Sequence, residues 1–153
     1  MERNLAVFRL AAVVAALLLL LAGIAGCGRD ESADTAMAVD WASSYEAGMA
    51  RARQTGKPVM LVFHADWCHW CKKLEEDVFT SPKVGQASER LVNVRVNTDN
   101  NQELARKYKV RYLPTVYFLH PSGEILDEFQ GDRTPSGFVQ AMERVAGQAG
   151  KAG

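Results

Sequence analysis

The sequence predicts a single α/β domain over residues 39–150, with a central mixed β-sheet and helices on both of its faces. Two observations lead to this fold class. The run PVMLVFHA, after Gly56 and Lys57, is almost wholly apolar, which is typical of a strand buried on both faces. The periodic segments follow the order helix, strand, helix, strand, helix, strand, strand, helix, and that order favours a layered α/β arrangement.

The first half of the domain contains two predicted helices around that strand. Residues 43–57 place Tyr45 and Met49 four positions apart, as on one face of a helix, and Gly56 is suited to end it. The buried strand follows. A second helix is expected to begin at Cys68, and its inward face consists of Cys71, Leu74 and Val78.

The second half contains three predicted strands and two helices. The expected strands are residues 91–99, 115–120 and 125–131, the last two joined by the turn sequence PSGE. Asp99 is expected to cap a helix over residues 100–110, and Thr134 to begin the last helix ahead of a proline. The inward stripe of the last helix consists of Phe138, Met142 and Val145.

The overall charge excludes one class of partner. The chain carries 18 basic and 18 acidic residues, so its formal net charge is zero. Nucleic-acid binding domains are usually basic, because they neutralise phosphates. The sequence therefore predicts no nucleic-acid partner.

Residues 1–26 differ in composition from the rest of the chain. Arg3 and Arg9 precede an uncharged apolar run, which is typical of a secretory signal peptide. The next residues, IAGC, resemble the lipobox of bacterial lipoproteins, which implies that Cys27 becomes the lipid-anchored first residue of the mature protein. An uncleaved anchor helix is the alternative. Both interpretations place the domain in the cell envelope, facing the periplasm or the exterior, and residues 27–38 are expected to form a flexible tether.

Cys68 and Cys71 form a C-x-x-C pair where a buried strand meets a helix, an arrangement typical of redox-active dithiols. A helix N-terminus stabilises thiolate, so Cys68 is expected to attack, and the more shielded Cys71 to resolve the mixed disulfide. A zinc site would need further ligands from His64, His69 or His120. A purely structural disulfide would close too short a loop to gain much entropy. We favour the redox pair without metal or cofactor, and interpret His64 as a core residue.

The stretches HADWCHWCKKLEEDVFTSPKV and VNTDNNQELARKYKVRYLPTVYFLHPSGEI resemble the C-terminal thioredoxin-like domain of the transmembrane thiol:disulfide interchange reductases (the DsbD family), and related secreted thioredoxins. The similarity covers residues 59–131. It implies a thioredoxin-like fold in which Pro114 follows a cis peptide bond beside the dithiol, and Leu113 offers backbone groups to a substrate. It also implies that Glu75 accepts or relays the proton of the second cysteine; an ion pair with Lys72 is the alternative.

The chain departs from the family pattern at Val62, where thioredoxins carry a buried aspartate. The proton of the second cysteine is then left to Glu75 or water. Trp67 and Trp70 are expected to form a substrate-docking surface, with a core position as the alternative for Trp67. His69 would favour thiolate on the preceding cysteine and make the disulfide more oxidising.

Together these features predict a membrane-tethered thiol:disulfide oxidoreductase that reduces protein disulfides through a Cys-His-Trp-Cys site. Its expected partners are protein thiols and disulfides and a membrane electron donor, and the protein is expected to be a monomer. Two alternatives stay open. One is an envelope disulfide oxidase or isomerase, and the other is a binding lipoprotein of the same fold without catalysis.

Overall fold

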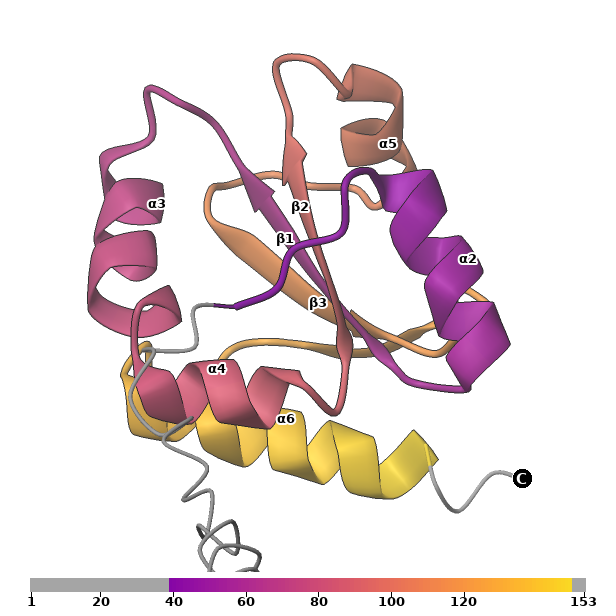
Figure 1. Cartoon of the computed structure of the whole chain (residues 1–153). Coiled ribbons are helices and arrows are strands. Elements are labelled where there is room, and N and C mark those ends of the chain that lie inside the picture. Colours follow the sequence, from indigo (N-terminus) through magenta and orange to yellow (C-terminus); the bar gives the residue numbers. More distant parts are fainter. Residues whose placement is uncertain (1–38, 150–153) are drawn as a thin grey trace, which may run out of the picture. The chain divides into compact units, whose positions relative to one another are not determined.

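The computed structural model describes residues 39–149, whose elements are labelled in Figure 1. The helical segments are α2 (Tyr45–Thr55), α3 (His69–Leu74), the π-helix η2 (Glu75–Phe79), α4 (Pro82–Ser88), α5 (Gln102–Lys107) and α6 (Pro135–Ala149). The strands are β1 (Val59–His64), β2 (Val92–Asn97), β3 (Thr115–Leu119) and β4 (Ile125–Glu128). Within this part of the chain, no helix combines the length and the apolar character needed to cross a membrane. The predicted signal peptide and tether, residues 1–26 and 27–38, lie outside it.

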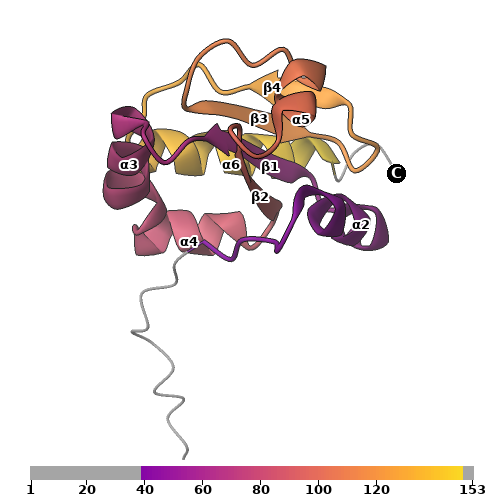
Figure 2. The same ribbon diagram turned by 90° about the horizontal axis from the view of Figure 1, so that it is seen from above.

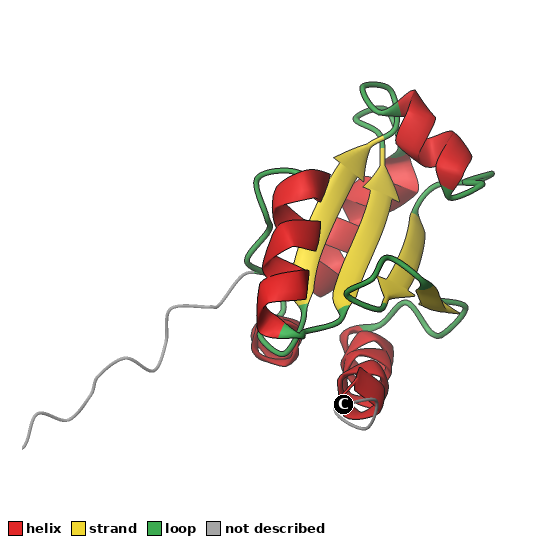
Figure 3. Ribbon diagram, turned by 90° about the vertical axis from the view of Figure 1, so that its right-hand side faces the viewer, coloured by secondary structure: helices red, strands yellow, loops and turns green. Residues whose placement is uncertain are grey.

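Strand β1 lies in the interior of a four-stranded sheet with the order β2-β1-β3-β4. It pairs in parallel with β2 and antiparallel with β3, and β3 pairs antiparallel with β4. Five of the six residues of β1 are buried, because helices lie on both sides of the strands (Figure 3). The predicted mixed sheet is therefore confirmed. Its register places Val62 of β1 opposite Arg95 of β2.

Two apolar cores occupy the two faces of the sheet. Helices α2 and α5 cover one face, where Met49 and Tyr108 pack with Phe63. The other face carries α3, η2, α4 and α6, and there Phe138 packs in one cluster with Val62. Helix α6 runs alongside the strands (Figure 2). Because side chains alternate along a strand, Val62 and Phe63 point into different cores.

The segment between β1 and β2 is more divided than predicted. The helix that follows Cys68 consists of α3 and the π-helix η2, and then a separate helix, α4, which the sequence pattern did not predict. Ser81 is extended, with φ −70° and ψ 126°, because a residue before proline is disfavoured in the helical conformation. Pro82 then begins α4, where its missing N–H is not needed.

Of the helix ends predicted at Gly56, Thr134 and Asp99, the first two are confirmed. Gly56 ends α2 in the left-handed conformation, with φ 68°. Thr134 begins α6, and its Oγ1 accepts a hydrogen bond from the N–H of Gly137 at 3.2 Å. The expectation that Asp99 caps α5 is wrong. Asn101 occupies that position, and the Asp99 carboxylate instead accepts a hydrogen bond from Trp67.

Candidate active site

Cys68 and Cys71 form a disulfide where β1 passes into α3, with their Cα atoms 5.3 Å apart. Cys68 is the N-cap of α3, and its Sγ accepts a hydrogen bond from the backbone N–H of Cys71 at 3.1 Å. A donor directed at this sulfur stabilises the thiolate that forms when the disulfide opens. The predicted position of Cys68 at the start of a helix is confirmed.

The predicted difference in shielding between the two cysteines is wrong. Cys68 is 5% exposed and Cys71 is 8% exposed. Both pack in one cluster with Ala65, because the disulfide holds the two sulfurs against the same wall. Position on the helix, and not exposure in the disulfide form, distinguishes the two cysteines.

Aromatic side chains flank the disulfide on the surface. Trp67 is 71% exposed and Trp70 is 63% exposed, so the core alternative for Trp67 is wrong. The indole N–H of Trp67 donates to the Asp99 carboxylate at 3.0 Å, which fixes the ring without burying it. The exposed His69 lies edge-on to Trp70, with the ring centroids 5.7 Å apart. Large apolar side chains that are exposed to solvent are typical of a surface that binds another molecule.

The loop before β3 lies beside the dithiol. The Leu113–Pro114 peptide bond is cis, as predicted. Pro114 is buried and shares the lining of a cavity with Cys71. Leu113 is half-buried and packs against the cluster that contains both cysteines.

The cavity behind Cys71 has a volume of about 230 Å³. Side chains from β1, α3, η2 and β2 contribute to its wall, among them Val62, His64, Cys71, Glu75 and Arg95. It lies on the face of the sheet that carries α3, so the predicted resolving cysteine faces both charged and titratable groups. Val62 is the position at which the resemblance to thioredoxins implies a carboxylate.

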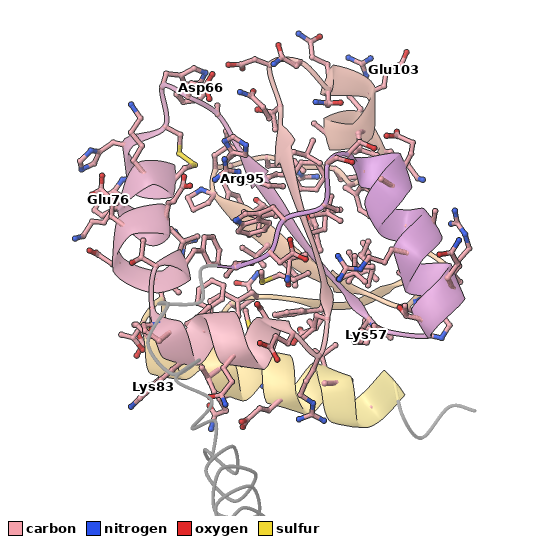
Figure 4. All side chains as sticks on the ribbon, in the orientation of Figure 1. Lys57, Asp66, Glu76, Lys83, Arg95 and Glu103 are labelled. Carbon is pink, nitrogen blue, oxygen red and sulfur yellow. A yellow bond between two sulfur atoms is a disulfide. The ribbon has the colours of Figure 1, made fainter. Side chains whose placement is uncertain are left out.

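Glu75 reaches the cavity, as its spacing from Cys71 predicts. Its carboxylate pairs with the guanidinium of Arg95, which lies between β2 and α3 (Figure 4). The alternative pairing with Lys72 is therefore wrong. Arg95 also lies over the ring of Trp41, with the guanidinium carbon 5.6 Å from the ring centroid. The sequence pattern did not predict this arginine, since only the pairing of β1 with β2 brings it to the site.

His64 also lines the cavity, so its interpretation as a core residue is wrong. It is half-buried at the end of β1, two positions after Val62 and hence on the same face of the sheet. Burial lowers its pKa, and the positive charge of Arg95 lowers that pKa further. The neutral imidazole is therefore favoured near pH 7. Alternation along the strand is the signal that could have identified this residue.

The three histidines do not gather into a ligand set. His120 lies at the turn between β3 and β4, where its Nδ1 is 2.8 Å from the Ser122 hydroxyl. His64 and His69 lie on the cavity wall and the exposed surface, respectively. Among residues 39–149, no group of three or more His, Cys, Asp or Glu side chains is placed to hold a metal ion.

Comparison with known proteins gives the family. Residues 40–121 match the model of the thioredoxin-like family. The thiol:disulfide interchange protein DsbD of Salmonella typhimurium is 40% identical over 83 residues, which make up 52% of this chain and 15% of that protein. The chain thus spans less than a fifth of the length of this relative.

Solved structures agree with the family match. A thioredoxin from Thermus thermophilus has a TM-score of 0.65 and 31% identity, over 74% of this chain and 92% of that one. The oxidised C-terminal domain of DsbD from Neisseria meningitidis has a TM-score of 0.58 and 25% identity, over 65% of this chain and 90% of that one. The predicted fold and the resemblance to DsbD are confirmed. Because the family match covers more than half of the chain, this protein belongs to the thioredoxin-like family.

Proposed function

We propose that this protein reduces disulfides of other proteins in the bacterial cell envelope, where it is anchored through lipid on Cys27. The observation that carries the proposal is the Cys68–Cys71 disulfide at a strand-to-helix junction, with a backbone N–H donated to the Cys68 sulfur. Such a donor favours thiolate at one of two otherwise equally buried sulfurs. The reaction needs no bound cofactor, because the two electrons come from the dithiol itself.

The two cysteines take successive roles. The Cys68 thiolate attacks one sulfur of a substrate disulfide, forms a mixed disulfide and releases the other substrate sulfur as thiolate. Cys71 then loses its proton and attacks the Cys68 sulfur. The Cys68–Cys71 disulfide forms, and the second substrate sulfur leaves. Glu75 and its partner Arg95 set the charge of the cavity into which Cys71 faces.

Substrates dock on the surface around the disulfide. Trp67, Trp70 and His69 offer exposed rings next to the dithiol in the sequence. Leu113 packs against the cluster that contains both cysteines, and Pro114 lines the cavity with Cys71. An extended, locally unfolded polypeptide fits this arrangement, because backbone pairing and apolar contacts tolerate many sequences. Protein thiols and disulfides are therefore the proposed partners of a monomeric enzyme.

The reducing direction is supported by the likeness to DsbD. His69 acts in the opposite sense, since a positive charge beside Cys68 stabilises thiolate and makes the disulfide more oxidising. His69 is exposed, so solvent screens it, and an interaction of about 1 kcal/mol corresponds to only about 20 mV. Thioredoxin and the strong oxidant DsbA differ by about 150 mV. This histidine alone does not reverse the direction.

Redox trapping in living cells tests the direction. Cells are quenched in acid and treated with an alkylating reagent, and Cys68 and Cys71 should be found mostly as free thiols. Deleting the membrane electron donor should convert the pool to disulfide. A pair that is fully oxidised in wild-type cells, and insensitive to that deletion, would favour the oxidase or the non-catalytic binding lipoprotein.

Trapping of adducts tests the division of roles. Cys71→Ala should accumulate mixed disulfides through Cys68, because the attacking thiol remains and the resolving thiol is gone. Cys68→Ala is the matched control and should accumulate none. Adducts on Cys71 in the control variant would reverse the assigned order of attack.

A further inference from the structure

The resolving cysteine must lose a proton before it can attack, and the usual acceptor position of the fold is apolar here. Val62 is 2% exposed and stands in the cavity wall. The next residue of β1 on the same face is His64, which lines the same cavity as Cys71. The imidazole of His64 therefore lies two residues along β1 from Val62, the position at which thioredoxins carry a carboxylate.

Charged groups from β2, η2 and the segments that follow β1 and β2 act on His64. Arg95 on β2 and the burial of the ring lower its pKa, whereas three acidic neighbours act in the opposite sense, namely Asp66, Glu75 and Asp99. Lys72 on α3 also contributes to the cavity lining. The result is a ring that is neutral near pH 7 and so has a free electron pair to accept a proton.

Glu75 is less suited to this role in the present arrangement. Its carboxylate is engaged by Arg95, and its side chain is 52% exposed. Glu75 begins η2 and is paired with Arg95 of β2, whereas His64 is half-buried at the end of β1 and lines the same cavity. Glu75 thus holds Arg95 in place, and Arg95 in turn affects His64.

We propose that His64 accepts the proton of Cys71, through the cavity, when Cys71 attacks the mixed disulfide. The imidazole becomes imidazolium as the Cys71 thiol becomes thiolate. The thiolate forms a bond to the Cys68 sulfur, and the bond from Cys68 to the substrate breaks. The departing substrate thiolate takes a proton from solvent, and His64 releases its own. This inference rests on the exchange reaction proposed above, with Cys71 as the resolving thiol.

The cavity has room for the transfer. Its volume of about 230 Å³ exceeds the share of one liquid water, about 30 Å³, several times over, so solvent can connect the ring to the thiol. A thiol of ordinary pKa, about 8.5, is only about 3% ionised at pH 7. Losing its proton acceptor should therefore slow the resolving step about thirty-fold at pH 7. Above pH 9 the thiol ionises unaided, and the difference should vanish.

The two thiols can be followed separately in one experiment. The reduced protein is mixed with 5,5′-dithiobis(2-nitrobenzoate) in a stopped-flow instrument. The first release of nitrothiobenzoate reports attack by Cys68, and the second reports resolution by Cys71. His64→Ala should leave the first phase unchanged and slow the second phase about thirty-fold at pH 7. His120→Ala, in the turn between β3 and β4, is the matched control and should change neither phase.

Two further measurements separate proton transfer from structure. Added imidazole should restore the second phase of His64→Ala, whereas the similarly shaped but weakly basic pyrazole should not. His64→Gln keeps more of the side-chain volume and should show the same pH-dependent defect. A second phase that is unchanged at pH 7, or slowed equally at pH 7 and above pH 9, would overturn the role of His64. A wild-type protein that releases no nitrothiobenzoate would overturn the exchange reaction itself.

Discussion

Placing a carboxylate in the cavity wall should make His64 dispensable. Val62→Asp introduces that group opposite Arg95, on the face of β1 that lines the cavity. Aspartate is close to valine in volume, so the substitution leaves little void. If His64 takes the proton of Cys71, a second acceptor at this position should matter only when the imidazole is absent.

The cost of the substitution in stability follows from the burial of Val62, which is 2% exposed. A fully buried valine side chain contributes about 1.5–3 kcal/mol. Burial of the new carboxyl adds a further penalty, which the nearby guanidinium of Arg95 partly offsets. We expect a loss of about 2–4 kcal/mol in the free energy of unfolding, measured with urea on the oxidised protein. The free energy of unfolding of native domains is usually about 5–15 kcal/mol, so the variant should stay folded.

The kinetic effect is read from a double-mutant cycle on the second nitrothiobenzoate phase at pH 7. Val62→Asp alone should change that phase less than about two-fold, because the native acceptor is still present. In the His64→Ala background the same substitution should accelerate it about ten-fold, which corresponds to a coupling energy of about 1.4 kcal/mol. The first phase is the internal control in all four proteins.

Additivity would refute the reasoning. If Val62→Asp changes the second phase by the same factor with and without His64, then the two positions act independently and the imidazole is not the acceptor. A loss of stability beyond about 5 kcal/mol would refute the packing estimate separately, since it exceeds the usual cost of one core substitution.

Three further predictions concern charge, packing and anchoring. Arg95→Gln removes a positive charge that lowers the pKa of His64, so the pKa of this histidine should rise. In a pH–rate profile, the fall in the rate of the second phase at acidic pH should then begin at a higher pH. A profile that does not move contradicts this. Phe138→Ala truncates a fully buried ring between Phe79 and Phe129 and should cost about 3–5 kcal/mol in urea unfolding, whereas a loss below about 1 kcal/mol would show that the face collapses around the gap. Cys27→Ser should abolish fatty-acid labelling in cells, and retained labelling would exclude this anchor.

Local sequence was sufficient for most elements of the fold. The continuous apolar run of β1 predicts a strand covered on both faces, since an edge or half-exposed strand would alternate. Gly56 and Thr134 mark helix ends because their preferences act within a few residues of the chain. The same holds for Cys68, whose position before α3 follows from the strand-to-helix transition.

Contacts between distant segments decided the rest. The pairing of β1 with β2 sets Arg95 opposite Val62, and this register gives Glu75 a partner other than Lys72. The same face brings His64 to the cavity behind the disulfide. Periodicity in the sequence predicts which residues share one face of a helix or strand. It does not predict which other helix or strand that face will pack against. The sequence by itself therefore determined the dithiol and its place at the start of a helix. Only the tertiary structure decided which groups surround the sulfur of Cys71. Those groups come from several strands and helices, and local sequence does not encode how these elements are placed relative to one another.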